Sequence, residues 1–304
     1  MNKKLKIATL IISSNTYPAI RNSKTQKKLF FEQNFDRDLT FWYKSGKKSE
    51  LKNKEFKLKD NFLLINTDDS SINMGLKTIL AFEWLLENRE FEFLIRPTPS
   101  SYINFLNMQT FIMENLTNIE YVYSGKIQST NDKYKNKINF VSGSTLILNK
   151  KTVQLIVDNK HEWDHDYWDD VALYILLNKL GITYQEGDRF DVAGSPFIQQ
   201  IPTNFYQYRC RADNHYNYPR FLESLTLINV HKLVTGKKMN PATIFINKFY
   251  YWVSKKLYIY QFGWKVYLNL RKILKIILPS FLYNLIKNKF IGNITDFKHK
   301  RFKT

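Results

Sequence analysis

Two adjacent carboxylates open an apolar helical segment and form the sharpest chemical signal in the chain. Asp169 and Asp170 stand directly before Val171 and the run Ala-Leu-Tyr-Ile-Leu-Leu. Acids in the first turn of a helix are stabilised as anions by the helix dipole. A carboxylate held in that form can accept a proton from a hydroxyl group as the hydroxyl attacks an electrophile. The alternative is a plain helix start with acidic first-turn residues, and the residues alone leave both readings open.

The segment before these acids adds aromatic and acidic side chains. Trp163 and Trp168 flank the triplet Asp164-His165-Asp166. Tryptophan rings stack well on sugar rings, so we predict that both bind an acceptor, with burial in the core as the alternative. The triplet has the pattern of a metal-binding Asp-x-Asp, which short sequences also produce by chance.

A second polar segment runs from a loop into a helix. Asp69, Asn73 and Lys77 share it, and an acid, an amide and a lysine at a helix start can bind the base, ribose and phosphate of a nucleotide. The alternative is a polar turn in which Asn73 caps the helix and Lys77 lies on a solvated face.

Two further segments place small or cationic residues at strand ends. Arg96 ends an apolar strand just before Pro97 and Pro99, and its guanidinium could neutralise a diphosphate without a metal or pair with one nearby acid. Ser142 and Gly143 lie in a turn where a substrate could approach closely, or which is only a tight bend.

Apolar patterning predicts the elements that position these residues. Gly181 falls where a glycine ends a helix. We expect a solvated loop over the charge-dense segment 44–60, strands at 5–13, 41–43, 62–65, 91–95 and a pair within 139–148, and helices at 21–33, 75–88, 102–113 and 169–180. This alternation predicts an α/β fold with a mostly parallel central sheet and a ligand site at the carboxyl ends of the strands. A glycine-rich phosphate loop and a Rossmann fingerprint are both missing, which argues against P-loop and dinucleotide chemistry.

Composition narrows the class of protein further. The 304 residues include 44% hydrophobic and 16% aromatic residues, enough for a packed core. The single cysteine, Cys210, excludes an internal disulfide framework and Cys/His zinc cages, and it fits a reducing compartment. The charged, apolar start of the chain resembles a short signal peptide, but it has no small-residue cleavage site, so we read it as a buried strand.

The order and spacing of these segments resemble the fringe and β-1,3-galactosyltransferase families, which are nucleotide-sugar transferases with the GT-A fold. Those families have an Asp-Ser-Tyr-x-Asn-Leu-Thr-x-Lys-Thr segment, to which residues 69–78 are similar, followed by a helix tryptophan that Trp84 matches. Their Ser-Gly-Gly turn is similar to residues 142–144. Their acid-Asp-Val helix start and Leu-Gly-Ile helix end are similar to residues 169–171 and 180–182. The resemblance covers roughly residues 60–185.

This resemblance implies a hexosyltransferase-like domain over residues 1–235 that inverts the sugar's anomeric centre. Asp170 would deprotonate the acceptor hydroxyl, with Asp169 beside it. The donor would be a nucleotide sugar and the acceptor a glycan or lipid-linked glycan. The abundance of Lys, Asn and Ile is typical of an AT-rich bacterial or viral coding sequence, which would suit capsule or lipopolysaccharide synthesis.

One departure from the family affects the metal. Where the family has Asp-Asp-Asp to hold a divalent cation, this chain has Thr98-Pro99-Ser100, and neutral hydroxyls are poor ligands for a hard cation. Manganese or magnesium is still possible as a cofactor, but the acidic triplet that would hold it is absent. We therefore expect other groups to neutralise the charge of the donor diphosphate. We predict that the donor-binding residues are Asp69, Asn73, Lys77, Arg96, Ser100, Ser142, Gly143, Arg209, Arg211 and His231.

The charge of +19 gathers at the C-terminal end. From Asn240 onwards there are thirteen lysines and arginines against one acid. We expect residues 236–304 to form a basic helical appendage, in which 264–278 is an amphipathic helix lying on an anionic membrane. This predicts a cytoplasmic enzyme peripheral to the inner face of a membrane, with no nucleic-acid partner. The alternatives are a helical subdomain packed on the core, a non-catalytic sugar- or partner-binding protein, and a basic membrane- or nucleic-acid-binding module.

Overall fold

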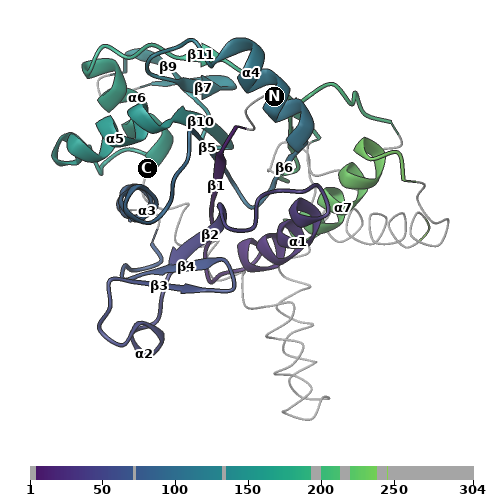
Figure 1. Ribbon diagram of the computed structural model, residues 1–304, viewed down its shortest axis with the longest axis horizontal. Coiled ribbons are helices and arrows are strands. Elements are labelled where there is room, and N and C mark those ends of the chain that lie inside the picture. Colours follow the sequence, from purple (N-terminus) through teal and green to yellow (C-terminus); the bar gives the residue numbers. More distant parts are fainter. Residues whose placement is uncertain are drawn as a thin grey trace, which may run out of the picture.

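The computed structural model describes residues 5–70, 73–131, 135–192, 200–212, 220–237 and 245 (Figure 1). The predicted amphipathic helix at 264–278 lies outside the described residues, as does almost all of the predicted appendage. The division into 1–235 and 236–304 therefore stays a prediction. Within the described part of the chain, each helix is too short or too polar to cross a membrane.

An eight-stranded sheet forms the centre of the molecule and confirms the predicted α/β fold. Its order is β11-β7-β10-β5-β1-β2-β4-β3, and the four neighbours from β5 to β4 are all parallel. β10 is antiparallel to β5 and β7, β3 is antiparallel to β4, and β11 is parallel to β7. The strands are β1 (Ile7–Ile12), β2 (Thr40–Ser45), β3 (Phe56–Lys59), β4 (Phe62–Ile65), β5 (Phe93–Pro97), β7 (Tyr123–Gly125), β10 (Thr145–Asn149) and β11 (Gln185–Glu186).

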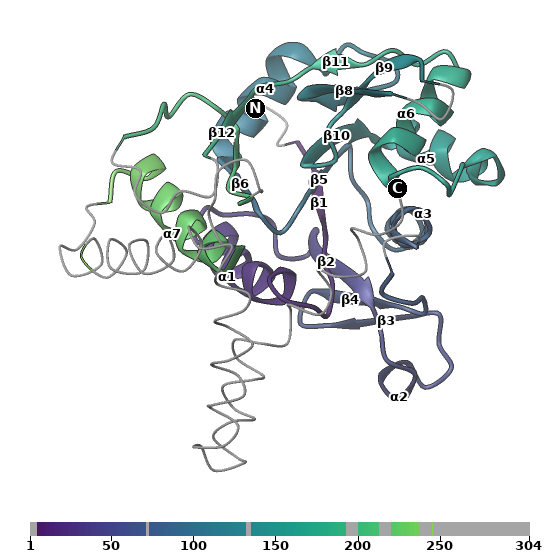
Figure 2. The ribbon, with the colours of Figure 1, turned by 180° about the vertical axis from the view of Figure 1, so that it is seen from behind.

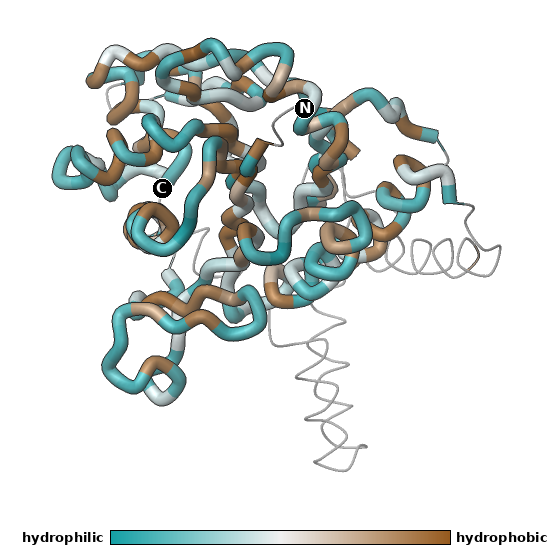
Figure 3. The backbone as a smooth tube through the Cα atoms, viewed as in Figure 1, coloured by the Kyte–Doolittle hydropathy of each residue, from teal (hydrophilic) through white to brown (hydrophobic). Residues whose placement is uncertain are grey.

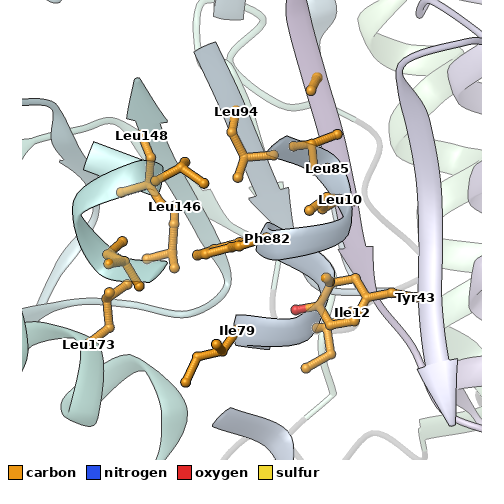
Figure 4. Packing of buried hydrophobic residues seen from close by; sticks show 14 of the residues in the cluster. Leu10, Ile12, Tyr43, Ile79, Phe82, Leu85, Leu94, Leu146, Leu148 and Leu173 are labelled. Atoms are coloured by element: carbon orange, nitrogen blue, oxygen red, sulfur yellow. The ribbon is translucent and has the colours of Figure 1, made fainter. Parts of the chain in front are cut away.

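Helices cover both faces of this sheet, which is why all six residues of β1 are buried and read as one apolar run. On one face lie α3 (Met74–Asn88), α5 (Lys150–Asp158) and α6 (Asp169–Lys179), with Phe82 packed among Leu10, Leu94 and Leu173 (Figure 4). On the other face lie α1 (Ala19–Phe31) and α4 (Phe105–Asn115). Figure 3 shows the apolar residues concentrated along the central strands.

A second, smaller sheet packs beside the first. It contains β12 (Arg189–Asp191), β13 (Gln207–Arg209) and β6 (Ser101–Ile103) in that order. Its apolar face, with Tyr102, Tyr208 and Cys210, packs against α7 (Glu223–Val234), which lies alongside α1 in both views (Figures 1 and 2). The remaining elements are α2 (Lys48–Leu51), the hairpin of β8 (Ile127–Asn131) and β9 (Lys137–Val141), and the 3-10 turns at Lys160–Glu162 and Arg220–Leu222.

Most of the long predicted elements are confirmed, including α3 and α6. The segment 139–148 contains two strands as expected, but they belong to different sheets, since β9 pairs with β8 and β10 lies between β5 and β7. Gly181 follows the end of α6 with a φ of +76°, as expected for a glycine after a helix. The prediction for 44–60 was wrong, because β2 extends to Ser45 and the segment then forms α2 and β3, with Leu51 buried. The prediction for 102–113 was partly wrong, because the segment starts in β6 and α4 begins only after Asn104, whose side chain accepts a hydrogen bond from the Asn107 N–H.

The contact between α3 and Trp163 gives a first prediction. A Cβ added at Gly75 would lie 2.5 Å from Trp163 Nε1. Alanine is normally favoured over glycine in a helix by about 1 kcal/mol, but overpacking a core costs about 1–3 kcal/mol. We therefore expect Gly75→Ala to lower the free energy of unfolding measured in urea. Glu87→Ala, on the exposed side of the same helix, should change it by less than about 0.5 kcal/mol. An unchanged or higher stability for Gly75→Ala would show that Trp163 moves aside freely.

Candidate active site

A buried arginine at the end of β5 ties the site together. Arg96 is 1% exposed, and its Nη2 forms an ion pair with the carboxylate of Asp169, which is 9% exposed at the start of α6. Arg96 Nε donates to Tyr43 Oη at 2.9 Å, Nη2 to Thr78 Oγ1 at 3.3 Å and Nη1 to the Gly143 carbonyl at 3.3 Å. Burial alone would lower the pKa of Arg96, but the charge of Asp169 raises it above its ordinary value. Of the two roles that the sequence left open for Arg96, the structure shows the pairing with an acid.

Asp170, the next residue, has a different environment. Its Oδ2 accepts the N–H of Gly143 at 2.8 Å, and its Oδ1 accepts the N–H of Val171 at 3.0 Å. Burial, and next the charge of Asp169, raise the pKa of Asp170 to about 6, against the lowering effect of Arg96 and of the two N–H groups. A carboxyl with a pKa near neutral is well suited to take up a proton during a reaction. Asp169 is engaged by Arg96, so Asp170 is the acid of the pair that is set up to exchange a proton.

The turn formed by residues 142–144, called here the 142–144 turn, leaves little space for a side chain at its centre. A Cβ added at Gly143 would lie 3.0 Å from Asp170 Oδ2 and 3.3 Å from Arg96 Nη1. On the two flanking residues, the hydroxyls of Ser142 and Ser144 accept hydrogen bonds from Arg189 Nη1 at 3.1 and 3.0 Å. The sequence reasoning missed Arg189, because its three-residue strand carries no pattern that identifies its partners.

The start of α3 supplies a second polar cluster. Lys77 Nζ lies 2.8 Å from Asp69 Oδ1, and Asp69 Oδ2 accepts the N–H of Asn15 at 2.8 Å. Lys44, which the sequence did not single out, donates from Nζ to Asn15 Oδ1 at 2.8 Å, and burial lowers the pKa of Lys44. Asn73 precedes α3, but within the described residues its side chain makes no capping hydrogen bond. The structure therefore brings Asp69 and Lys77 into contact and adds Asn15 and Lys44 to them.

This cluster adjoins the acid pair, because Thr78 follows Lys77 and contacts Arg96. The residues of this cluster and Arg96 also lie at the ends of neighbouring strands of the sheet. Asn15 follows β1, Lys44 is the next-to-last residue of β2, Asp69 follows β4 and Arg96 is the next-to-last residue of β5. These four strands are parallel neighbours, so their carboxyl ends meet at one edge of the sheet, where ligands bind in α/β folds.

Three predicted donor-binding residues lie at the loop after β5, called here the 98–101 loop. The Cys210 N–H donates to the Ser100 carbonyl at 2.7 Å, and Arg209 is paired with Ser101 across the small sheet. Arg211 lies two residues beyond the end of β13 and is exposed. The Thr98 N–H donates to the Ser144 carbonyl at 3.0 Å, so this loop lies beside the 142–144 turn.

His231 and Trp163 are both buried in packed parts of the molecule. His231 is buried between α7 and α1, where its ring contacts Tyr102 Oη and Glu32 Oε2, both at 3.1 Å, and burial lowers its pKa. Trp163 is only 5% exposed and packs in the core, whereas stacking on a sugar requires an accessible ring face. Trp168, 59% exposed immediately before the acid pair, has such a face.

The end of β5 does not fit a divalent cation. The hydroxyls of Thr98, Ser100 and Ser101 are neutral and contact one another, at 3.0 Å for Thr98 with Ser101 and 3.5 Å for Thr98 with Ser100. In the described ranges, no three side chains of His, Cys, Asp or Glu gather into a group able to hold a metal ion.

No protein-family model and no curated relative matches the chain. Among solved structures, it is similar to a glycosyltransferase involved in the glycosylation of the major capsid of PBCV-1, at 9% identity and a TM-score of 0.45, over 73% of this chain and 98% of that one. It is also similar to the glycosyltransferase GlyE of Streptococcus pneumoniae TIGR4, at 13% identity and 0.41, over 83% and 65%. A third is the inositol-1-phosphate CTP transferase from T. maritima, at 8% and 0.42, over 75% and 98%.

The raised pKa of Asp170 predicts a pH-dependent stability. The ordinary pKa of 3.8 applies to the unfolded chain and the value of about 6 to the folded one. Between these values the folded state binds the extra proton, so the wild type loses stability as the pH rises from about 4 to 6. Asp170→Asn removes this titration. Its free energy of unfolding relative to wild type should therefore rise by up to about 3 kcal/mol across that range and stay constant above it.

Urea unfolding at a series of pH values checks this expectation. Asp166→Asn, at an exposed acid of the preceding loop, is the matched control and should show no such trend. A constant difference between Asp170→Asn and the wild type at all pH values would show that Asp170 titrates normally.

Proposed function

We propose that this chain is an inverting glycosyltransferase that moves a sugar from a nucleotide-sugar donor to a hydroxyl of a glycan or lipid-linked glycan. The observation that carries the proposal is the acid pair at the start of α6. One carboxylate is neutralised by a buried arginine, and the other has its pKa raised to about 6. Pairs of acids whose environments separate their roles in this way are characteristic of acid–base catalysis. The order of the sequence segments shared with the fringe and β-1,3-galactosyltransferase families supports the same reaction.

In this reaction Asp170 is the general base. The acceptor's O–H proton passes to the Asp170 carboxylate while the acceptor oxygen forms a bond to the anomeric carbon of the donor sugar. The bond from that carbon to the diphosphate oxygen breaks, and its electron pair leaves with the diphosphate. Attack from the face opposite the leaving group inverts the anomeric centre. The Gly143 N–H orients the Asp170 carboxylate, and Arg96 acts as a positioning residue through Asp169.

The donor and acceptor sides follow from the same geometry. The carboxyl edge of the parallel strands carries Asn15, Lys44, Asp69 and Lys77. These residues supply the hydrogen-bonding groups and the positive charges that a nucleotide needs, so we assign the donor to this edge. The exposed ring of Trp168, next to the acid pair, supports a role in stacking on the acceptor sugar.

The cellular setting is a further part of the proposal. We place the enzyme in surface-polysaccharide synthesis, such as that of a capsule or lipopolysaccharide, at the inner face of a membrane. The thirteen basic residues against one acid after residue 239 support membrane contact, because basic residues near an anionic surface contribute about 1 kcal/mol each. A non-catalytic sugar-binding protein is the second candidate, favoured by the absence of an acidic triplet after β5.

Nucleotide release from a panel of nucleotide sugars, with a panel of glycan acceptors, tests the proposal. We expect Asp170→Asn to lower turnover by roughly 100-fold or more, because general-base catalysis contributes about 10²–10⁴ in rate. Donor binding by calorimetry should persist in this variant, and Asp166→Asn should keep wild-type turnover. Wild-type turnover in Asp170→Asn would remove Asp170 from the mechanism. Neither turnover nor nucleotide-sugar binding in the wild type would favour the non-catalytic candidate.

A further inference from the structure

Strand β13 runs antiparallel to β6, beside the 98–101 loop. Its register pairs Arg209 with Ser101, and the hydrogen bond from the Cys210 N–H to the Ser100 carbonyl continues the pairing by one residue. Arg211 is the next residue after Cys210 and lies just beyond the end of β13. The position where an acidic triplet would hold a cation is thus adjoined by one arginine in β13 and a second that follows it.

Side chains on this strand alternate between its two faces. Tyr208 and Cys210 are buried in the apolar cluster against α7. Gln207 and Arg209 share the opposite face, which is turned towards the 142–144 turn, because Gln207 Nε2 donates to Ser144 Oγ at 3.0 Å, and the exposed Arg211 follows beyond the end of the strand. We call this surface, together with the matching side chains of β12, the basic face.

Exposure increases along the basic face, from Gln207 at 0% to Arg209 at 20% and to the exposed Arg211. From β12, Asp191 contacts two guanidinium groups, at 3.0 Å for Arg189 and 3.9 Å for Arg209. The basic face thus carries three guanidinium groups and one carboxylate among its described side chains. Its buried end also shows incomplete pairing, since the Nε of Arg189 has no hydrogen-bond partner among the described residues.

Such a surface suits a phosphate anion. A guanidinium fork is permanently charged and matches the geometry of phosphate oxygens, and cations placed near a departing diphosphate stabilise the charge that develops on it. The 98–101 loop offers hydroxyls and no carboxylate, and the one described carboxylate of the basic face, Asp191, is paired with Arg189. The same loop lies against Ser144, which places this surface beside the turn that holds Asp170.

We propose that Arg209 and Arg211 bind the diphosphate of the donor over the 98–101 loop, where they take the role that a divalent cation would otherwise have. This inference rests on the proposed function, because it assigns a subsite of the same donor. It explains how the charge of the leaving group is met although Arg96 is engaged by Asp169. Arg189 lies deeper and holds the 142–144 turn in place.

Calorimetric binding of UDP, GDP, CDP and ADP, each in EDTA and in Mn²⁺, tests this subsite without relying on turnover. We expect the wild type to bind at least one of them with the same affinity in both conditions. Arg209→Gln and Arg211→Gln should each weaken that affinity by about tenfold or more, and the corresponding monophosphate should be weakened less. The control is Arg37→Gln, which removes an exposed arginine just before β2. This arginine lies at the amino end of the strand, away from the carboxyl ends, so the variant should leave affinity unchanged.

Three outcomes would count against the subsite. Binding that is lost in EDTA, restored by Mn²⁺ and unaffected by the arginine variants would overturn it and leave the proposed function standing. Equal weakening of the diphosphate and the monophosphate would also overturn it, because the arginines would not then act on the diphosphate. No binding of any of the four nucleotides by the wild type would overturn both proposals. Because Arg211 is exposed, Arg211→Gln is the variant least affected by changes in folding, which circular dichroism and melting temperature verify.

Discussion

The site depends on the buried ion pair between Arg96 and Asp169. Arg96 joins four separate parts of the chain, since it contacts β2 through Tyr43, α3 through Thr78, α6 through Asp169 and the 142–144 turn through Gly143. Removing one partner of a buried pair costs about 3–5 kcal/mol, whereas replacing both by apolar residues is often neutral. Stability alone therefore does not require this pair. It does give α3, α6 and the turn one fixed arrangement, on which the position of Asp170 depends.

The same pair divides the work between the two acids. With Asp169 engaged, Asp170 lies in a buried setting next to a negative charge, and two backbone N–H groups hold its carboxylate in place. Cations lie on two sides of this base, at the start of α3 and on the basic face, while a third cation, Arg96, is used internally. The base, Asp170, is thus distinct from the cations that could bind an anion. A transfer reaction with a charged leaving group needs both: a group that accepts the proton and groups that stabilise the charge of the leaving group.

Much of the fold could be predicted from apolar patterning, because long buried elements give long signals. β1, α3 and α6 have such signals, and Gly181 marked the end of α6. The segment 44–60 could not be predicted, since a four-residue helix and a four-residue strand are too short for a period to appear. Its single buried anchor, Leu51, is surrounded in the sequence by charged residues.

The site was less predictable than the fold, because its contacts join residues that are distant in sequence. Arg96 and Asp169 are 73 residues apart and meet only through the sheet and the packing of α6 upon it. Trp163 and Trp168 are five residues apart, yet one is buried and the other exposed, which local sequence does not distinguish. The roles of Arg189 and Lys44 depend on strand register, which no local pattern reports.

The central claim is that burial, and next to it the charge of Asp169 held in place by Arg96, raise the pKa of Asp170. Carboxyl ¹³C NMR of protein labelled at aspartate tests it directly, with the Asp170 resonance identified as the one lost in Asp170→Asn. The account predicts a titration midpoint near 6 in the wild type. In Asp169→Asn it predicts a clearly lower midpoint, because the neighbouring negative charge is gone and Arg96 then acts on Asp170 alone. A wild-type midpoint at the ordinary value of 3.8, or a midpoint that does not fall in Asp169→Asn, would contradict the account.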